Sequence, residues 1–161
     1  MRHGKAEAFA AEDHRRRLTQ RGARDVHAAG QWLAEEGLVP THAFVSSAVR
    51  TRETWDQLVA ATGAEIQPVV DDAIYTSGPD SMLDILRTTP DGAEVVLYVG
   101  HNPTAASLAH VLDDGEADPE AFRAMSAGFP PAALAVLDVH VPWAELDAAS
   151  ARLVGFHAGH G

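Results

Sequence analysis

Apolar positions along the chain alternate between helical spacing and short strand-like runs. From Thr19, a candidate N-cap, small and apolar residues recur at helical intervals until Gly37, which predicts an amphipathic helix. A second helix is predicted over residues 51–63, which end at a glycine, and a third from Pro79. A further helix is predicted from Pro103, because proline suits the first helical position.

Short apolar runs between these helices are typical of buried strands. The clearest are "HAFVSS" at residues 42–47 and "EVVLYVG" at 94–100, while "AEIQPVV" at 64–70 is predicted to be extended. Two more strands are predicted over 132–141 and 151–158. Because strands and helices alternate, we expect one three-layer α/β/α domain with a largely parallel sheet.

Composition narrows the class of protein. The chain of 161 residues is 46% hydrophobic and 22% charged, as expected for a single domain, 1–161, with one core. It has no cysteine, no apolar run near the ~20 residues that span a bilayer, and no apolar stretch suited to a signal peptide at its start. We therefore expect a cytoplasmic protein without membrane association. We also expect a monomer, because one core accounts for the apolar positions.

Charge adds a further restriction. The formal net charge is −11, which opposes non-specific attraction to nucleic acid. The acidic segment "DDGEADPE" at residues 113–120 is predicted to be a solvated loop. An anionic substrate would have to be attracted by a few well-placed cations. All Lys and Arg side chains of this chain except one are arginines, and the planar guanidinium group suits phosphate oxygens.

Residues directly after strands are the first candidates for function, since reactive groups collect at the carboxyl ends of parallel strands. Arg2 with His3, Arg50 and His101 are such residues. Alone, Arg50 is more typical of a surface residue, and His101 of a surface or hydrogen-bonded structural residue. Arg2-His3-Gly4 occurs by chance in many proteins. Arg52 must point away from Arg50 on a helix, so one of the two is expected to face a site. We expect the glycine before His101 to permit an unusual turn, and the next helix to direct free N–H groups toward an anion there.

The candidates gain meaning together. "RHGKAE" at the start, "RRLTQRG" at 16–22, "SSAVRTRET" at 46–54 and "LYVGHNPTAASLAHVL" at 97–112 resemble the histidine phosphatase superfamily, and within it the small SixA-like phosphohistidine phosphatases. The resemblance covers almost the whole chain and implies a phosphoglycerate mutase-like fold. Two departures stand out. The family usually has proline where Ser47 stands, and it has an apolar strand before Arg-His-Gly.

The resemblance also implies roles. His3 is implied to be the nucleophile, Arg2 and Arg50 to hold the phosphoryl oxygens, and His101 to be the second pocket histidine, with Asn102 among the phosphate-binding residues. This set suits phosphoryl transfer, which depends on positioning and fixed positive charge. Two nearby guanidinium groups are expected to lower the His3 pKa from ~6.5 and keep the imidazole neutral. No metal and no cofactor is implied.

The leaving group decides between substrates. Asn102 cannot donate a proton, and the candidate acids are Asp71 and Asp72, whose alternative interpretation is as solvated loop carboxylates. A phosphoramidate loses imidazole more easily than an ester loses an alcohol, so a weak or missing acid favours phosphohistidine of a protein as substrate. Two alternatives remain open: a phosphatase of small phosphate esters, and a phosphate-binding module without turnover.

Other histidines receive structural interpretations. His27, His42, His157 and His160 lack a ligand spacing with carboxylates, so a zinc site is disfavoured and the last two are expected to be exposed. His14 stands beside a basic run, 15–17, that we expect to border the entrance of the site and to matter little to the rate.

The first residues raise a separate expectation. By resemblance, an apolar strand precedes Arg2 inside the sheet, so Met1 would occupy the last position of that strand. We expect several more apolar residues before Met1 in the natural protein. In the 161-residue form we expect either a gap beside residues 94–99 or a segment from a neighbouring chain filling it. Without such a strand, His3 is expected to be poorly held.

Overall fold

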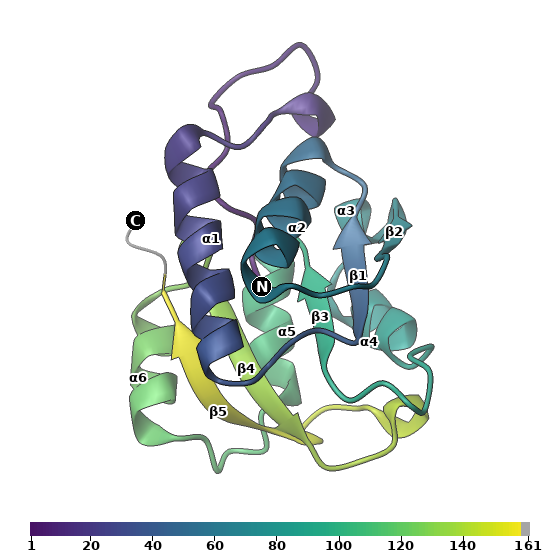
Figure 1. Ribbon diagram of the computed structural model, residues 1–161. Helices are drawn as coiled ribbons and strands as arrows, with labels where there is room; N and C mark the ends of the chain where they lie inside the picture. Colours follow the sequence, from purple (N-terminus) through teal and green to yellow (C-terminus); the bar gives the residue numbers. More distant parts are fainter. Residues whose placement is uncertain (159–161) are drawn as a thin grey trace.

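The computed structural model describes residues 1–158, and its strands form two small sheets (Figure 1). One is parallel with the strand order β2 (Val69–Asp71), β1 (His42–Ser46) and β3 (Val96–Val99), and the other is an antiparallel hairpin of β4 (Leu134–Val139) and β5 (Ala151–His157). In the parallel sheet, Phe44 lies opposite Val69 on one side and Tyr98 on the other. None of the helices among these residues is long and apolar enough to cross a bilayer.

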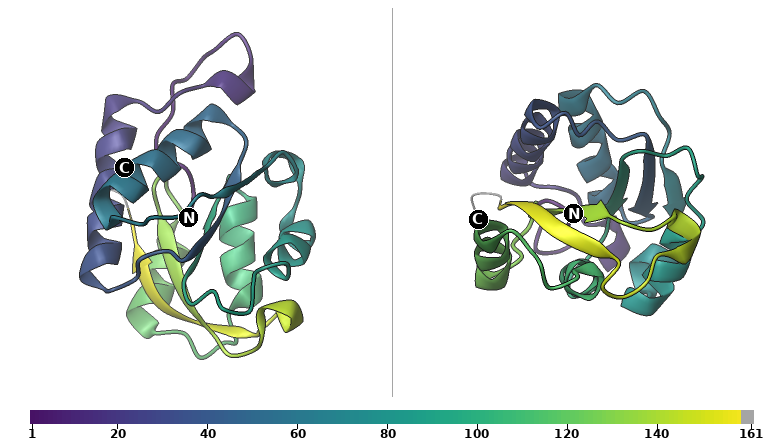
Figure 2. Two further views of the ribbon diagram at one scale, coloured as in Figure 1. Left: turned by 45° about the vertical axis from the view of Figure 1, so that its right-hand side comes forward. Right: turned by 90° about the horizontal axis from the view of Figure 1, so that it is seen from below.

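Helices cover both faces of the parallel sheet, as predicted for a three-layer α/β/α fold (Figure 2). The described helices are α1 (Gln20–Glu35), α2 (Val49–Thr62), α3 (Ala73–Thr76), α4 (Pro79–Leu86), α5 (Thr104–Leu112) and α6 (Pro119–Ala127), with short 3-10 turns η1 (Asp13–Arg15) and η2 (Trp143–Glu145). Alternation along β1 separates the layers: Ala43 and Val45 pack with α1 and α2, while Phe44 packs with α4 and α5.

Local sequence signals predicted the ends of the long helices correctly. The Thr19 side chain accepts the Gly22 N–H at 3.0 Å and caps α1, and Gly63 ends α2 in the left-handed conformation with φ of 70°. The helix expected from Pro103 begins one residue later, with Pro103 as its N-cap. The extended segment 64–70 contributes only the short β2.

The acidic segment 113–120 was wrongly predicted to be loop throughout. Asp118 accepts the N–H groups of Glu120 and Ala121, and Pro119 starts α6. The Asp-Pro pair is an N-cap followed by a first-turn proline. The acidic residues around this pair led to the prediction of a solvated loop.

The chain after His3 lies very close to α1. A Cβ on Gly4 would come within 2.7 Å of the Val26 side chain, and one on Gly22 would collide with the backbone of Lys5. Both glycines are therefore required by backbone packing. This contact fixes the direction in which the chain leaves His3.

Residues 1–3 join the two sheets. Arg2 pairs with Gly100 as a parallel bridge beyond β3, and its N–H donates to the Ala133 carbonyl at 2.9 Å. The Met1 ammonium donates to the Tyr98 carbonyl at 2.8 Å. In the described chain these residues are all that pairs with β3 on the side away from β1.

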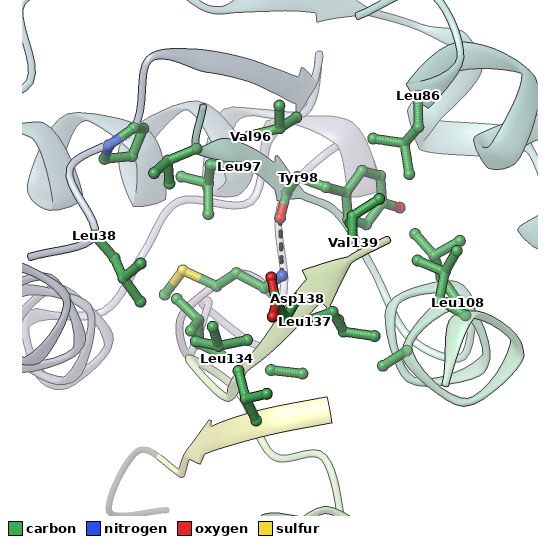
Figure 3. Close-up of a pocket in the computed structure, with 18 of the residues that line it drawn as sticks. Leu38, Leu86, Val96, Leu97, Tyr98, Leu108, Leu134, Leu137, Asp138 and Val139 are labelled. Carbon is green, nitrogen blue, oxygen red and sulfur yellow. Dashed lines mark hydrogen bonds between the residues drawn. The ribbon is translucent and has the colours of Figure 1, made fainter. Parts of the chain in front are cut away.

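Beyond this junction, β3 and β4 separate around an apolar cavity of about 510 Å³, here called the apolar slot (Figure 3). Its walls include Leu97 of β3, Leu134 and Leu137 of β4 and Leu108 of α5, and Met1 lines it at the junction. Burial lowers the pKa of the Met1 ammonium to about 5. Residues 1–3 thus lie where the end of a strand parallel to β3 would lie.

Candidate active site

A polar pocket of about 560 Å³ lies beyond the carboxyl ends of β1 and β3. It contains all five residues predicted from the sequence, contributed by the chain start, α2 and the segment after β3. Its lining consists of Arg2, His3, Lys5, Ala6, Asp13, Arg16, Arg50, Tyr75, His101, Asn102 and Pro131. The predicted residues therefore lie together, although up to 100 positions separate them in the sequence.

His3 is held firmly by its own backbone. Its N–H donates to the Gly100 carbonyl and its carbonyl accepts the Ala132 N–H, both at 3.0 Å. The Gly4 N–H donates to the Thr54 hydroxyl at 3.1 Å. The expectation that His3 would be poorly held is therefore wrong, because its backbone is hydrogen-bonded on both sides.

The His3 ring has a defined orientation. Its Nδ1 lies 2.7 Å from the Gly4 carbonyl, which can only accept, so the proton sits on Nδ1. This leaves the Nε2 lone pair within the pocket, 3.3 Å from Nε of Arg50. The ring centroids of His3 and His101 are 5.2 Å apart.

The His3 imidazole is neutral over most of the pH range. Burial lowers its pKa to about 4, the bond to the Gly4 carbonyl opposes this, and the Arg50 and Arg2 charges lower it further. The predicted direction is correct. The main cause differs, since desolvation of the side chain outweighs the two guanidinium groups.

Arg50 is the central cation of the pocket, and 4% of it is exposed. Its Nη1 donates to the Asp13 carbonyl at 2.8 Å, and its Nη2 lies 3.1 Å from the Asp13 carboxylate and 3.3 Å from Nδ1 of His101. With the contact to His3, four of its five N–H groups point at protein atoms. Arg52 is exposed, as expected for the other member of the pair.

His101 is supported by the end of β1. Its Nε2 lies 2.7 Å from the hydroxyl of Ser46, a fully buried residue. Burial first, and then the His3 and Arg50 charges, lower the His101 pKa to about 3. Because Nδ1 accepts from Arg50, Nε2 carries the proton and donates to Ser46.

The structure bears on two expectations about the neighbourhood of His101. Gly100 does not have the positive φ of an unusual turn; it is required because a Cβ there would collide with the Tyr98 side chain. The first turn of α5 is also partly satisfied, since the Ala105 N–H donates to the His101 carbonyl at 2.8 Å.

Arg2 and Asn102 meet at one carbonyl. Both donate to the Phe129 oxygen at 2.9 Å, which orients the two side chains along one wall. The Arg2 Nε and the Asn102 Oδ1 are buried without a hydrogen-bond partner within residues 1–158. A buried N–H without a partner is costly, so Arg2 has donor capacity for an anion entering the pocket.

Sequence reasoning missed the carboxylate of the pocket. Asp13, from η1, accepts from Arg16 at 2.8 Å and from the Tyr75 hydroxyl at 2.7 Å, besides its contact with Arg50. The Tyr75 hydrogen bond, followed by the Arg50 charge, holds the Asp13 pKa well below its usual range. Asp13 is therefore an anion at neutral pH.

The carboxylates predicted as acids lie elsewhere. Asp71 accepts the Ala73 N–H at 2.8 Å at the start of α3, and neither Asp71 nor Asp72 lines the pocket. His14 lies near the entrance, with Nε2 2.9 Å from the Ser47 hydroxyl and its ring edge-on to Tyr75. No motif marked Asp13 or Tyr75, because only the fold brings them to Arg50.

The structure gives the scattered histidines packing roles. The His157 ring stacks on Trp32, and the His42 ring packs edge-on against Phe44. His160 lies outside the described residues. Within residues 1–158 no group of three or more His, Asp or Glu side chains is arranged to hold a metal ion.

The geometry combines a neutral imidazole with cations in a confined space. Arginine donors from the chain start and from α2 suit a tetrahedral anion, and Nε2 of His3 opens onto the same space. An electrophilic phosphorus held by Arg2 and Arg50 would lie next to a nitrogen lone pair. The arrangement is therefore suited to nucleophilic phosphoryl transfer.

Comparison with known proteins leads to one family. Residues 1–74 match the model of the histidine phosphatase superfamily (branch 1). An uncharacterised protein of Mycobacterium tuberculosis is 33% identical over 159 residues, which cover 98% of this chain and 98% of that protein. A phosphohistidine phosphatase SixA homolog of Haemophilus influenzae is 33% identical over 131 residues, covering 76% and 79% of the two chains.

Solved structures agree with these relatives. A protein from Nakamurella multipartitia, assigned as the phosphohistidine phosphatase SixA, superimposes with a TM-score of 0.86 and 34% identity. The match covers 100% of this chain and 94% of that one. Fold and sequence therefore agree over the full length.

Proposed function

From the premise that the chain belongs to the histidine phosphatase superfamily, we propose that it removes the phosphoryl group from phosphohistidine of a protein. The reaction passes through a phosphohistidine intermediate on His3. Arg2, Arg50, His101 and Asn102 bind the phosphoryl oxygens. The observation that carries this proposal is the neutral His3 ring, whose proton lies on Nδ1 and whose Nε2 opens into an arginine-lined pocket.

In the first step, Nε2 of His3 forms a bond to phosphorus while the P–N bond of the substrate breaks. Arg2 and Arg50 stabilise the charge spread over the phosphoryl oxygens. Nε2 has a single lone pair, which in the resting protein faces Arg50 at 3.3 Å. Arg50 must therefore give up this long contact and turn its N–H groups to the phosphoryl oxygens as His3 attacks.

In the second step, water attacks the phosphoryl group on His3. A new O–P bond forms as the Nε2–P bond breaks, the proton of the water passes to solvent, and inorganic phosphate leaves. The Nδ1 hydrogen bond to the Gly4 carbonyl, at 2.7 Å, favours the phosphorylated imidazole because Nδ1 keeps its proton throughout. His3 then returns to its neutral state.

The charges in the pocket favour phosphohistidine over an ester. An imidazole whose second nitrogen is protonated leaves as a neutral molecule, whereas an alkoxide needs a proton. Asp13, the single carboxylate among the described lining residues, is held ionised by Tyr75 and Arg50 and cannot supply one. An acidic group suited to protonating an ester oxygen is missing from this lining.

One assay tests the proposal. Phosphate release is measured from a phosphohistidine peptide and from p-nitrophenyl phosphate, with the wild type and His3→Ala. We expect turnover of the phosphohistidine peptide by the wild type alone. Faster turnover of the ester would favour a small-molecule phosphatase, and release from neither would favour a phosphate-binding module.

We place the activity in the cytoplasm, the setting that the absence of cysteine suits.

A further inference from the structure

An apolar tip projects from the loop that borders the pocket, visible at the top of Figure 1. Residues 8–11 are Ala-Phe-Ala-Ala, and all four are exposed. Phe9 is 89% exposed, whereas the next most exposed large hydrophobic residues of the described chain, Val70 and Phe122, reach 47%. Four consecutive exposed apolar residues are unfavourable on a surface unless they serve a function.

The tip is anchored at both ends. On one side, the Thr19 N–H donates to the Lys5 carbonyl at 2.9 Å and the Glu7 N–H to the Arg17 carbonyl at 2.8 Å. On the other side, Asp13 is bound to Arg50 inside the pocket. The loop therefore holds Phe9 in a defined place relative to the phosphoryl site.

The covalent chain limits how far Phe9 can lie from the pocket. Phe9 is three residues from Ala6 and four from Asp13, which both line the pocket. An extended chain spans at most ~3.6 Å per residue, so these Cα separations are no more than about 11 and 14 Å. A molecule bound at His3 that extends by roughly such a distance can therefore touch Phe9.

We propose that Phe9 is a docking anchor for the polypeptide that carries the phosphohistidine, and that it contacts an apolar side chain three to five residues from the phosphorylated one. This inference rests on the proposed function. The spacing follows from reach, since three to five extended residues span about 10 to 17 Å. A polypeptide bound at His3 has the length to cover the tip and can bury the aromatic ring, the kind of side chain enriched in interface cores.

Two peptides and three proteins test this proposal. One fluorescein-labelled phosphohistidine peptide has leucine three to five residues from the phosphohistidine on both sides, and the other has serine at those positions. Binding is measured by fluorescence anisotropy on a His3→Ala background, so that no turnover is needed. We expect the leucine peptide to bind about tenfold more tightly than the serine peptide. Phe9→Ser should reduce that ratio to below twofold.

Phe122→Ser is the matched control, because Phe122 is an exposed phenylalanine on α6 that does not line the pocket. It should keep the tenfold ratio. A ratio near one for His3→Ala alone, or a ratio that survives the addition of Phe9→Ser, overturns the docking role. Analytical ultracentrifugation tests whether the tip contacts a second copy of the chain. A concentration-dependent dimer that Phe9→Ser abolishes, together with no preference between the two peptides, would assign the tip to that contact and overturn the docking role. Failure of the proposed function would appear separately, as absent phosphate release by protein with His3 intact.

Discussion

Two hollows of similar size lie on either side of residues 1–3. The polar pocket of about 560 Å³ is lined by His3, and the apolar slot of about 510 Å³ is lined by Met1. In the pocket, Arg50 directs four N–H groups at protein acceptors and Asp13 balances its charge. In the slot region, the Met1 ammonium is buried with its pKa lowered to about 5, and the Tyr98 hydroxyl is buried without a partner within residues 1–158.

The difference shows that volume alone does not identify a site. The pocket gathers cations around one neutral imidazole, an arrangement suited to chemistry. The slot has leucine and valine walls between two strands that do not pair with each other, which is a feature of packing. Changes in the pocket should therefore alter catalysis and anion binding, and changes in the slot should alter stability.

The strongest test of the comparison is His3→Ala. We expect phosphate release from phosphohistidine to fall by about 1,000-fold or more, because the proposed nucleophile is lost. Phosphate affinity, measured by calorimetry, should change by less than about threefold, since the cations remain. A rate loss below tenfold would contradict the role given to His3.

The pH dependence of stability tests whether His3 is neutral. Its pKa is about 4 in the folded protein and ~6.5 in the unfolded chain, so between these values only the unfolded chain binds the proton. Stability should be complete above pH 6.5 and fall as the pH decreases toward 4, with His3 alone contributing a loss on the order of 3 kcal/mol.

Urea unfolding at several pH values between 7 and 4 measures this loss. His3→Gln should show a shallower decrease, because the substituted side chain does not titrate. Equal slopes for the two proteins would mean that His3 titrates normally in the folded state.

Arg50→Ala should weaken phosphate binding and turnover together. A charge-assisted contact contributes about 1.5 to 3 kcal/mol, so phosphate affinity should fall about 10- to 100-fold. Arg52→Ala is the matched control, since Arg52 is exposed and does not line the pocket. Similar mild losses from both variants would remove Arg50 from the phosphate site.

The smallest expected effect concerns the slot. Joining a five-residue apolar segment in front of Met1 should raise the melting temperature by about 5 °C, by burying side chains and replacing the buried ammonium with an amide. It should also raise the phosphatase rate slightly, because His3 follows directly. A Gly-Ser segment of equal length is the control. Equal melting temperatures for the two forms would show that the slot does not accept a strand.

Prediction from sequence succeeded where signals were local. Thr19, Gly63 and Pro79 mark helix ends by their own chemistry, and four short segments taken together resembled the family. Prediction from sequence failed where contacts between distant parts of the chain determine the structure. Asp13 belongs to a charged stretch that is typical of a solvated surface, and only the fold brings it to Arg50. The cause of the low His3 pKa was likewise out of reach, because burial is a property of the packed chain.

The contact between Asp13 and Arg50 means that the resting pocket already contains an anion. Phosphate that takes two N–H groups of Arg50 can use the fifth one and the one that contacts His3 in the resting protein, which leaves the Asp13 carboxylate in place at 3.1 Å. Phosphate then binds as a second negative charge beside Asp13. Because Asp13 already balances part of the Arg50 charge, phosphate affinity should depend only weakly on ionic strength.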